Sequence, residues 1–238
     1  MNKNQEMPRG WSVIKVGLMS ELLRGVSYKK EDASNTPKTG YLPILRANNI
    51  NSELNFDDLV YVPKKYIEDY QIVKAGDILF AMSSGSKHLV GKSAFAKNDF
   101  NGSFGAFCGL LRINDSINKK FISNIFKGDS YRKHISEVSK GTNINNLKRE
   151  NILDFEISLP PLPEQQRIVA KIEELFSSLD KGIESLKTAQ QQLKVYRQAV
   201  LKWAFEGKLT NKNVKEGELP EGWKWLKLDD VVDEFVRG

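Results

Sequence analysis

The sequence predicts a mixed α/β (α+β) domain that is followed by one long, coiled-coil-forming α-helix. Three observations predict this fold class. Short apolar runs separated by polar loops fill residues 1–160, and an apolar seam with helical spacing crosses residues 161–210. The N-terminal motif then begins again within residues 211–238. With 238 residues, the chain is long enough to form one or two domains with a core of ordinary size.

The first 160 residues alternate between strand-like runs and polar loops. The apolar runs predict strands at residues 11–16, 59–62, 77–82, 104–113 and 152–158. Residues 121–139 are predicted to be helical, with an interruption at Gly128. Polar loops occupy residues 27–40, 83–87 and 140–151. Because loops carry function more often than the strands that hold them, binding residues are expected there.

The long helix has a clear start and a clear end. Prolines in the run LPPLP (159–163) exclude a helix upstream and favour a start at this point. Glu164 then suits the positive end of the helix dipole, and Lys202 suits the negative end. Gly207 is placed to adopt the left-handed conformation that ends a helix. The roughly 40 residues between span about 60 Å at ~1.5 Å per residue, which exceeds what one compact domain needs.

An apolar seam follows this helix in steps of three and four residues, as in coiled coils. It interrupts the strict heptad near Leu179 and Leu193, and it includes the polar Gln190, which favours a defined register. The alternative is a helix that packs on its own domain. The residues predicted to contact a partner helix are Ile168, Ile172, Leu175, Leu179, Ile183, Leu186, Gln190, Leu193, Tyr196 and Val200.

The motif MPRGWSVIK (7–15) recurs as LPEGWKWLK (219–227), at a constant offset of 212 residues. Each copy continues to an Arg-Gly pair, at Arg24-Gly25 and at Arg237-Gly238. An offset of this size indicates that a whole module begins again. The organisation expected is therefore a first domain in residues 1–160, a long helix in 161–210, and the start of a second module in 211–238.

Charge is unevenly distributed along the chain. The net charge of +6 lies entirely within residues 1–160, because the remainder is neutral. This segregation favours a nucleic-acid-binding first domain, with solvated surface lysines as the alternative. The single cysteine, Cys108, lies in an apolar run and is expected in the core, which fits a reducing compartment. Neither a membrane span nor a signal peptide is recognisable, so a cytoplasmic location is expected.

The sequence lacks the motifs of several common kinds of catalytic site. A phosphate loop needs four residues between its glycines, but five separate Gly85 from Gly91. No GxGxxG motif is present for a dinucleotide, and two histidines with one cysteine cannot form a zinc set. No nucleophile elbow accompanies either histidine. The chain is therefore expected to be non-catalytic, with no metal site and no cofactor of its own.

These residues resemble the DNA-specificity subunits of Type I restriction-modification systems. The resemblance covers essentially the whole chain. Its segments are GYLPILRANNI (40–50), AGDILFAMSSGSKHLVGKSAF (75–95), GTNINNLKRENILDFEISLP (141–160), ISLPPLPEQQRIVAKIEELFSSLD (157–180), AVLKWAFEGKLT (199–210) and LPEGWKWLKLDDV (219–231).

The resemblance implies a division of labour between subunits. Residues 1–160 would be a target-recognition domain that reads one half of a split site in double-stranded DNA. The long helix would be the spacer that docks methyltransferase subunits, which bind S-adenosylmethionine and methylate adenine. A motor/nuclease subunit would cleave unmodified DNA with ATP and Mg. The alternative from another class is a dimeric coiled-coil adaptor whose α/β domain binds protein.

Family members carry two recognition domains, whereas this chain shows one domain and the start of a repeat. The chain is expected to be a natural half-subunit or a truncated product. Two copies are expected to form a homodimer through antiparallel long helices. A twofold dimer would read an interrupted palindrome, because the symmetry of the site mirrors that of the protein.

Side chains in the polar loops are the expected DNA contacts, although Ser, Asn and Gly also serve turns. They are Arg46, Asn48, Ser84, Ser86, Lys87, Lys92, Asn143, Asn145 and Lys148. Methyltransferase docking is expected on the flanks of the helix. The alternative is that these residues pack in the core between two paired helices. The residues proposed for docking are Gln165, Gln166, Arg167, Trp203 and Phe205.

Overall fold

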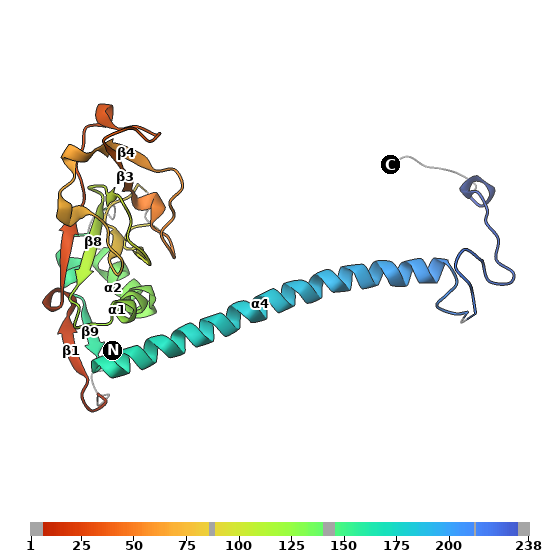
Figure 1. Cartoon of the computed structure of the whole chain (residues 1–238). Coiled ribbons are helices and arrows are strands. Elements are labelled where there is room, and N and C mark those ends of the chain that lie inside the picture. Colours follow the sequence, from red (N-terminus) through yellow and green to blue (C-terminus); the bar gives the residue numbers. More distant parts are fainter. Residues whose placement is uncertain (1–6, 86–88, 140–145, 212, 233–238) are drawn as a thin grey trace. The chain divides into compact units, whose positions relative to one another are not determined.

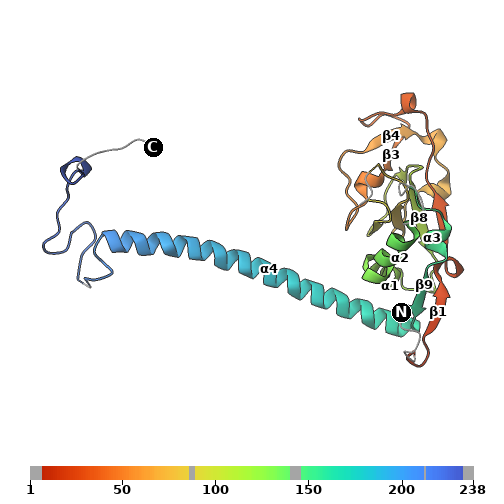
Figure 2. The ribbon, with the colours of Figure 1, turned by 180° about the vertical axis from the view of Figure 1, so that it is seen from behind.

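The computed structural model describes residues 7–85, 89–139, 146–211 and 213–232. The chain divides into two compact units, Met1–Ile172 and Glu173–Gly238. Several of its elements are labelled in Figure 1, and Figure 2 shows the same ribbon from behind. The first unit ends twelve residues beyond the predicted domain boundary at residue 160, because the first turns of the long helix pack on its core.

The described strands of the first unit form three small sheets. The four-stranded sheet is antiparallel and has the order β2 (Ser20–Arg24), β8 (Cys108–Ile113), β5 (Ile78–Ala81), β6 (Ser93–Phe95). The three-stranded sheet has the order β4 (Val60–Pro63), β3 (Tyr41–Leu45), β7 (Ser103–Phe104). In it β3 pairs antiparallel with β4 and parallel with β7. An antiparallel pair joins β1 (Ser12–Lys15) to β9 (Glu156–Leu159).

The helices that lie wholly within the first unit are short, and the long helix begins in this unit. The α-helices are α1 (Lys119–Lys127), α2 (Asp129–Ser139), α3 (Glu150–Leu153) and α4 (Leu162–Phe205), of which α4 continues into the second unit. The 3-10 helices are η1 (Val16–Leu18), η2 (Lys30–Asp32), η3 (Ala47–Asn49), η4 (Lys64–Tyr66), η5 (Asp69–Gln71) and, in the second unit, η6 (Leu228–Asp230). The Asn118 side chain caps α1 by accepting a hydrogen bond from the Phe121 N–H (3.0 Å), and Gly128 separates α1 from α2 as predicted.

The central strand β5 is buried on both faces, and its alternating side chains enter different clusters. Phe80 packs with Phe126 of α1 and Tyr131 of α2, at ring-centroid distances of 4.9 and 6.1 Å. Leu79, on the opposite face, belongs to the cluster that includes Leu45 of the three-stranded sheet. The four-stranded sheet is therefore covered by α1 and α2 on one face and by the three-stranded sheet on the other.

The predicted strands are confirmed at β1, β4 and β5, with boundaries shifted by one or two residues. The run at 104–113 is divided into β7 and β8 by a turn at residues 105–107. A strand starting at residue 152 is wrong, because α3 occupies Glu150–Leu153 before β9 begins. Strands β2, β3 and β6 were not predicted: β6 has three residues, and β3 contains Pro43, which disfavours a strand by propensity.

In the second unit, α4 ends as the sequence predicts. Gly207 has φ +72°, its N–H donates to the Ala204 carbonyl (3.0 Å), and the Lys208 N–H donates to the Trp203 carbonyl (2.8 Å). This is the hydrogen-bond pattern of a glycine-terminated helix. A side chain on Gly207 would overlap Pro220, so the following segment packs against this cap.

The second copy of the N-terminal motif has the same local backbone as the first. Gly10 and Gly222 have φ values of +85° and +83°, and each precedes a tryptophan whose N–H donates to a proline carbonyl at 3.0 Å. Helix η6 stands 212 residues after η1, the offset of the sequence repeat. Residues 224–227 are nevertheless not a strand, whereas the equivalent β1 pairs with β9. The local sequence is therefore sufficient to form the turn in both copies. The strand that follows forms only in the first copy, where β9 pairs with it.

Candidate nucleic-acid interface

A turn before β8 lies between the ends of β3 and β5 at one edge of the first unit. The Gly105 N–H donates to the Leu45 carbonyl at 2.9 Å. The Phe107 carbonyl accepts from the Met82 and Ser83 N–H groups at 2.9 and 3.0 Å. These bonds bring the segment that contains Arg46 and Asn48 next to the predicted polar loop at residues 83–87.

The segment before α3 joins the same edge. The Leu147 N–H donates to the Met82 carbonyl at 2.7 Å, and Ser83 forms an antiparallel bridge with Asn146. The Gly91 N–H donates to the Ala81 carbonyl at 2.9 Å, which closes the loop after β5. We name this surface the loop edge; it comprises residues 46–49, 83–85, 89–92, 105–107 and 146–148.

Arg46 and Asn48 lie on the loop edge directly after β3. The Arg46 Nη2 atom is 2.8 Å from the Asp58 carbonyl oxygen and 3.0 Å from Asp58 Oδ2. An exposed ion pair of this kind contributes only about 0–1 kcal/mol, so a phosphate could compete for the guanidinium. Asn48 is exposed on η3, while the neighbouring Asn49 is buried and accepts a hydrogen bond from the Arg46 N–H.

Three further predicted residues also lie on the loop edge. Lys148 is exposed, and its N–H donates to Asn151 Oδ1 at 2.8 Å at the start of α3. Lys92 and Ser84 are half-buried. The remaining predicted DNA contacts, Ser86, Lys87, Asn143 and Asn145, lie outside the described residues.

The polar loop at residues 27–40 begins beside the loop edge, where Val26 bridges Gly105, and ends at the opposite end of the three-stranded sheet. The Lys64 N–H donates to the Gly40 carbonyl at 2.9 Å, next to the paired residues Tyr41 and Pro63. Lys64 and Lys65 of η4 are exposed there. Lys64 and Lys65 therefore lie away from the loop edge, and they are natural controls for its lysines.

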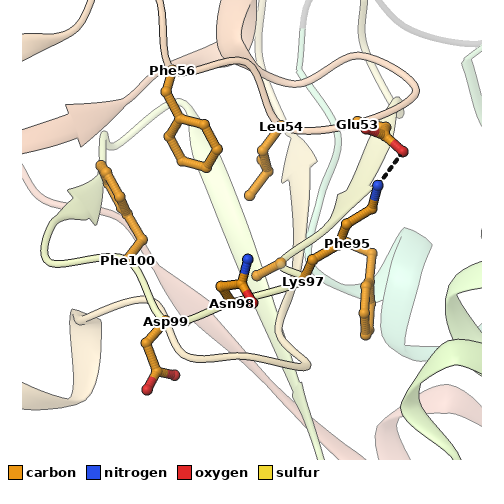
Figure 3. A pocket seen from close by; sticks show the side chains of 9 residues that line it. Glu53, Leu54, Phe56, Phe95, Lys97, Asn98, Asp99 and Phe100 are labelled. Atoms are coloured by element: carbon orange, nitrogen blue, oxygen red, sulfur yellow. Dashed lines mark hydrogen bonds and ion pairs between the residues drawn. The ribbon is translucent and has the colours of Figure 1, made fainter.

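A pocket of about 410 Å³ lies between the loop before β4 and the segment after β6 (Figure 3). Phe56 and Phe100 line it and pack against each other with ring centroids 5.2 Å apart. Lys97 and Glu53 form an ion pair of 2.5 Å at its side, and hydrogen bonding to Lys97 lowers the pKa of Glu53. This pocket was not predicted, because its two walls are about forty residues apart in the chain and share no motif.

The apolar seam of α4 is uncovered over most of its length. From Glu173 to Gln198 every residue of the helix is exposed, including Leu179 and Leu186 at 60% and 72%. Tyr196 and Leu193 are also more than 60% exposed, and Val200 is half-buried. Gln190 lies on this exposed stretch. Large apolar side chains aligned along one helix are typical of a surface that a partner covers.

The beginning of the predicted seam and docking surface has a different role. Gln165 is 2% exposed, accepts from the Asn118 N–H at 2.9 Å and donates to the Pro160 carbonyl at 2.8 Å. Its assignment to methyltransferase docking is therefore wrong, because both ends of its amide are used inside the domain. Ile168 packs against the same core and Ile172 is half-buried, so the open seam starts at Leu175.

The other four docking residues are on the surface. Gln166 and Arg167 are exposed in the first turns of α4, and Arg167 lies 4.0 Å from Glu164. Trp203 and Phe205 are 49% and 76% exposed in the last turn. Their positions are compatible with docking or with helix pairing.

Cys108 is buried in the core, as expected, and burial raises the pKa of its thiol to about 12. Among the residues that the structure describes, no group of three His, Cys, Asp or Glu side chains could hold a metal ion. None of the described helices is long and apolar enough to cross a membrane.

Comparison with known proteins gives consistent matches. The family model for the Type I restriction modification DNA specificity domain matches residues 8–195. The EcoKI specificity subunit of Escherichia coli (strain K12) is 45% identical over 234 residues, which covers 98% of this chain and 50% of the relative. The StySPI specificity subunit of Salmonella potsdam is 41% identical over 239 residues, covering 100% of this chain and 51% of the relative. The chain thus spans about half the length of the curated relatives it matches.

A solved structure shares the fold. The HsdS subunit from Thermoanaerobacter tengcongensis superposes with a TM-score of 0.61 and 22% sequence identity, over 87% of this chain and 47% of that one. The likeness agrees with a mixed α/β domain followed by one long helix.

Proposed function

Because the chain belongs to the family of Type I restriction-modification DNA specificity proteins, we propose that its first unit reads double-stranded DNA through the loop edge. The observation that carries this proposal is the meeting of three separate polar segments at one edge of the sheets. Hydroxyl and amide groups there suit base edges, while Arg46, Lys92 and Lys148 suit phosphates. The excess positive charge of residues 1–160 supports the same partner.

Helix α4 is proposed to pair with α4 of a second copy in antiparallel orientation. The exposed seam from Leu175 to Val200 supports the pairing, because apolar side chains at this spacing are buried by a facing helix. A helix of 44 residues is about 66 Å long at ~1.5 Å per residue. A twofold dimer on such a rod would hold two reading edges apart and would recognise a bipartite, palindromic site.

The chemistry is proposed to belong to partner subunits. Methyltransferase subunits would bind S-adenosylmethionine and methylate adenine at the site that this chain selects. A motor/nuclease subunit would use ATP and Mg to cleave unmodified DNA. Gln166, Arg167, Trp203 and Phe205 are the proposed docking residues, since all four are exposed. This chain would recognise the DNA sequence and would contribute no catalytic group.

Lysine substitutions test the DNA-binding edge. Lys92→Ala and Lys148→Ala are each expected to weaken binding to duplexes of any sequence. Each should reduce the slope of log K against log salt by about 0.9, as expected when one phosphate contact is lost. The measurement is fluorescence anisotropy with a labelled duplex at several salt concentrations.

Lys64→Ala and Lys65→Ala are the matched controls, because these exposed lysines lie at the opposite end of the three-stranded sheet. They should leave affinity and salt slope unchanged. Equal effects at both ends would show that the loop edge is not the binding surface. Absence of any salt-dependent DNA binding by the unmodified chain would favour a protein-binding adaptor instead.

A further inference from the structure

The loop edge carries one large apolar side chain that folding does not explain. Phe107 lies in the turn before β8, where the Cys108 N–H donates to the Gly105 carbonyl at 2.8 Å. Its side chain is 69% exposed, the highest value among the phenylalanines of the first unit. By comparison Phe56 is 50% exposed and packs against Phe100. Phe107 makes no ring contact with another aromatic side chain in the part of the chain that the structure describes.

The backbone beneath this ring is held from several sides. The Phe107 carbonyl accepts two N–H groups from the segment after β5, and the Gly105 N–H is bonded to Leu45. Behind the turn, a Cβ atom on Gly25 would lie 2.1 Å from the Gly105 oxygen, so the two backbones are in close contact. The backbone of the turn therefore has little freedom to move toward the core, and Phe107 is exposed to water in the chain.

We propose that Phe107 is the apolar base-contacting residue of the loop edge; this inference rests on the proposed DNA-reading function. The neighbouring bonded segments place Arg46, Ser84 and Asn146 on the same edge as Phe107, and these residues suit phosphates and base edges. A benzyl side chain has neither a positive charge nor a hydrogen-bond donor with which to bind a phosphate. It can contact a thymine methyl group or wedge against a base step, and both contacts depend on sequence.

This role separates Phe107 from the lysines of the same edge. Loss of a lysine removes a charge and changes binding to every sequence in a salt-dependent way. Loss of the ring removes only a contact with bases. It should therefore reduce preference for the target sequence without changing the number of phosphates contacted.

The test uses the full chain and duplex DNA. The unmodified protein first selects bound fragments from a random duplex pool, and a selected duplex is then compared with a scrambled one of equal composition. Phe107→Ala is expected to bind the selected duplex about tenfold more weakly, within the range for one specific base contact. Its affinity for the scrambled duplex and its salt slope should be unchanged. Phe107→Leu, which keeps an apolar side chain, should lose less affinity for the selected duplex than Phe107→Ala does.

Phe56→Ala is the matched control, since it removes another exposed phenylalanine from the pocket and should leave discrimination intact. Thermal unfolding of each variant monitors the fold, and Phe107→Ala should melt with the unmodified protein because its side chain is largely exposed. If Phe107→Ala and Phe107→Leu discriminate as well as the unmodified chain, the inference is overturned while the DNA-reading function stands. If the unmodified chain binds no duplex and selects no sequence, the proposed function falls as well.

Discussion

Replacing Gln165 with alanine should destabilise the first unit although it changes only one polar side chain. Gln165 joins the first turn of α4 to the start of α1, because its amide accepts from the Asn118 N–H and donates to the Pro160 carbonyl. Asn118 in turn caps α1. The alanine variant leaves both backbone groups without this partner, in a site where the side chain is 2% exposed.

The magnitude follows from the burial of those two groups. An unsatisfied buried donor or acceptor costs about 1–3 kcal/mol. The Asn118 N–H is only part-buried, so the expected loss in the free energy of unfolding is about 2–4 kcal/mol rather than the sum of both maxima. For a unit of this size, the midpoint of thermal unfolding should fall by about 5–15 °C.

Scanning calorimetry of Gln165→Ala and Gln166→Ala provides the measurement. Gln166 is the next residue on the same helix and is exposed, so its substitution should change the free energy of unfolding by no more than about 0.5 kcal/mol. If the two variants unfold within about 0.5 kcal/mol of each other, the bridging role of Gln165 is refuted. A defect in methyltransferase docking confined to Gln166→Ala would fit the corrected assignment.

Three further predictions concern other parts of the chain. The Cys108 thiol should resist Ellman's reagent at pH 8 until the protein is unfolded, because a pKa raised to about 12 by burial keeps it protonated; rapid labelling of the folded protein would contradict its burial. Gly25→Ala should cost about 3 kcal/mol in urea unfolding, since its Cβ would overlap the Gly105 oxygen, and a neutral result would show that the backbones separate readily. Leu186→Asp should raise the dissociation constant of the proposed dimer at least tenfold in sedimentation equilibrium while leaving the monomer folded, because Leu186 is 72% exposed in the chain; an unchanged constant would exclude the seam.

The long helix and its ends could be predicted because their signals are local. The LPPLP run, the three-and-four spacing and Gly207 act on neighbouring residues, and the helix is found at Leu162–Phe205 with Gly207 in the left-handed conformation. Gly128 likewise interrupts the predicted helix where expected. Strands were harder to predict. β3 contains Pro43 and is stabilised by pairing with β4 and β7, which local propensity does not reveal.

Only part of the candidate site could be predicted. Polar composition indicated Arg46, Ser84 and Lys148, but nothing local showed that their segments meet around the turn before β8. Phe107 was overlooked within an apolar run in which Cys108 is buried and Phe107 is exposed. Gln165 was misassigned because a glutamine near a helix start gives no sign that both ends of its amide are used by residues 118 and 160.

The fold class, the long helix with its apolar seam, the repeat at an offset of 212 residues and the family resemblance were all evident from the residues alone. These depend on short-range periodicity, turn chemistry and identity between segments. Packing in three dimensions was needed to show which loops share an edge, which glycines allow two backbones to approach closely and which polar side chains are buried. Such features arise from hydrogen bonds and packing between residues far apart in the chain, so no local pattern of amino acids encodes them visibly.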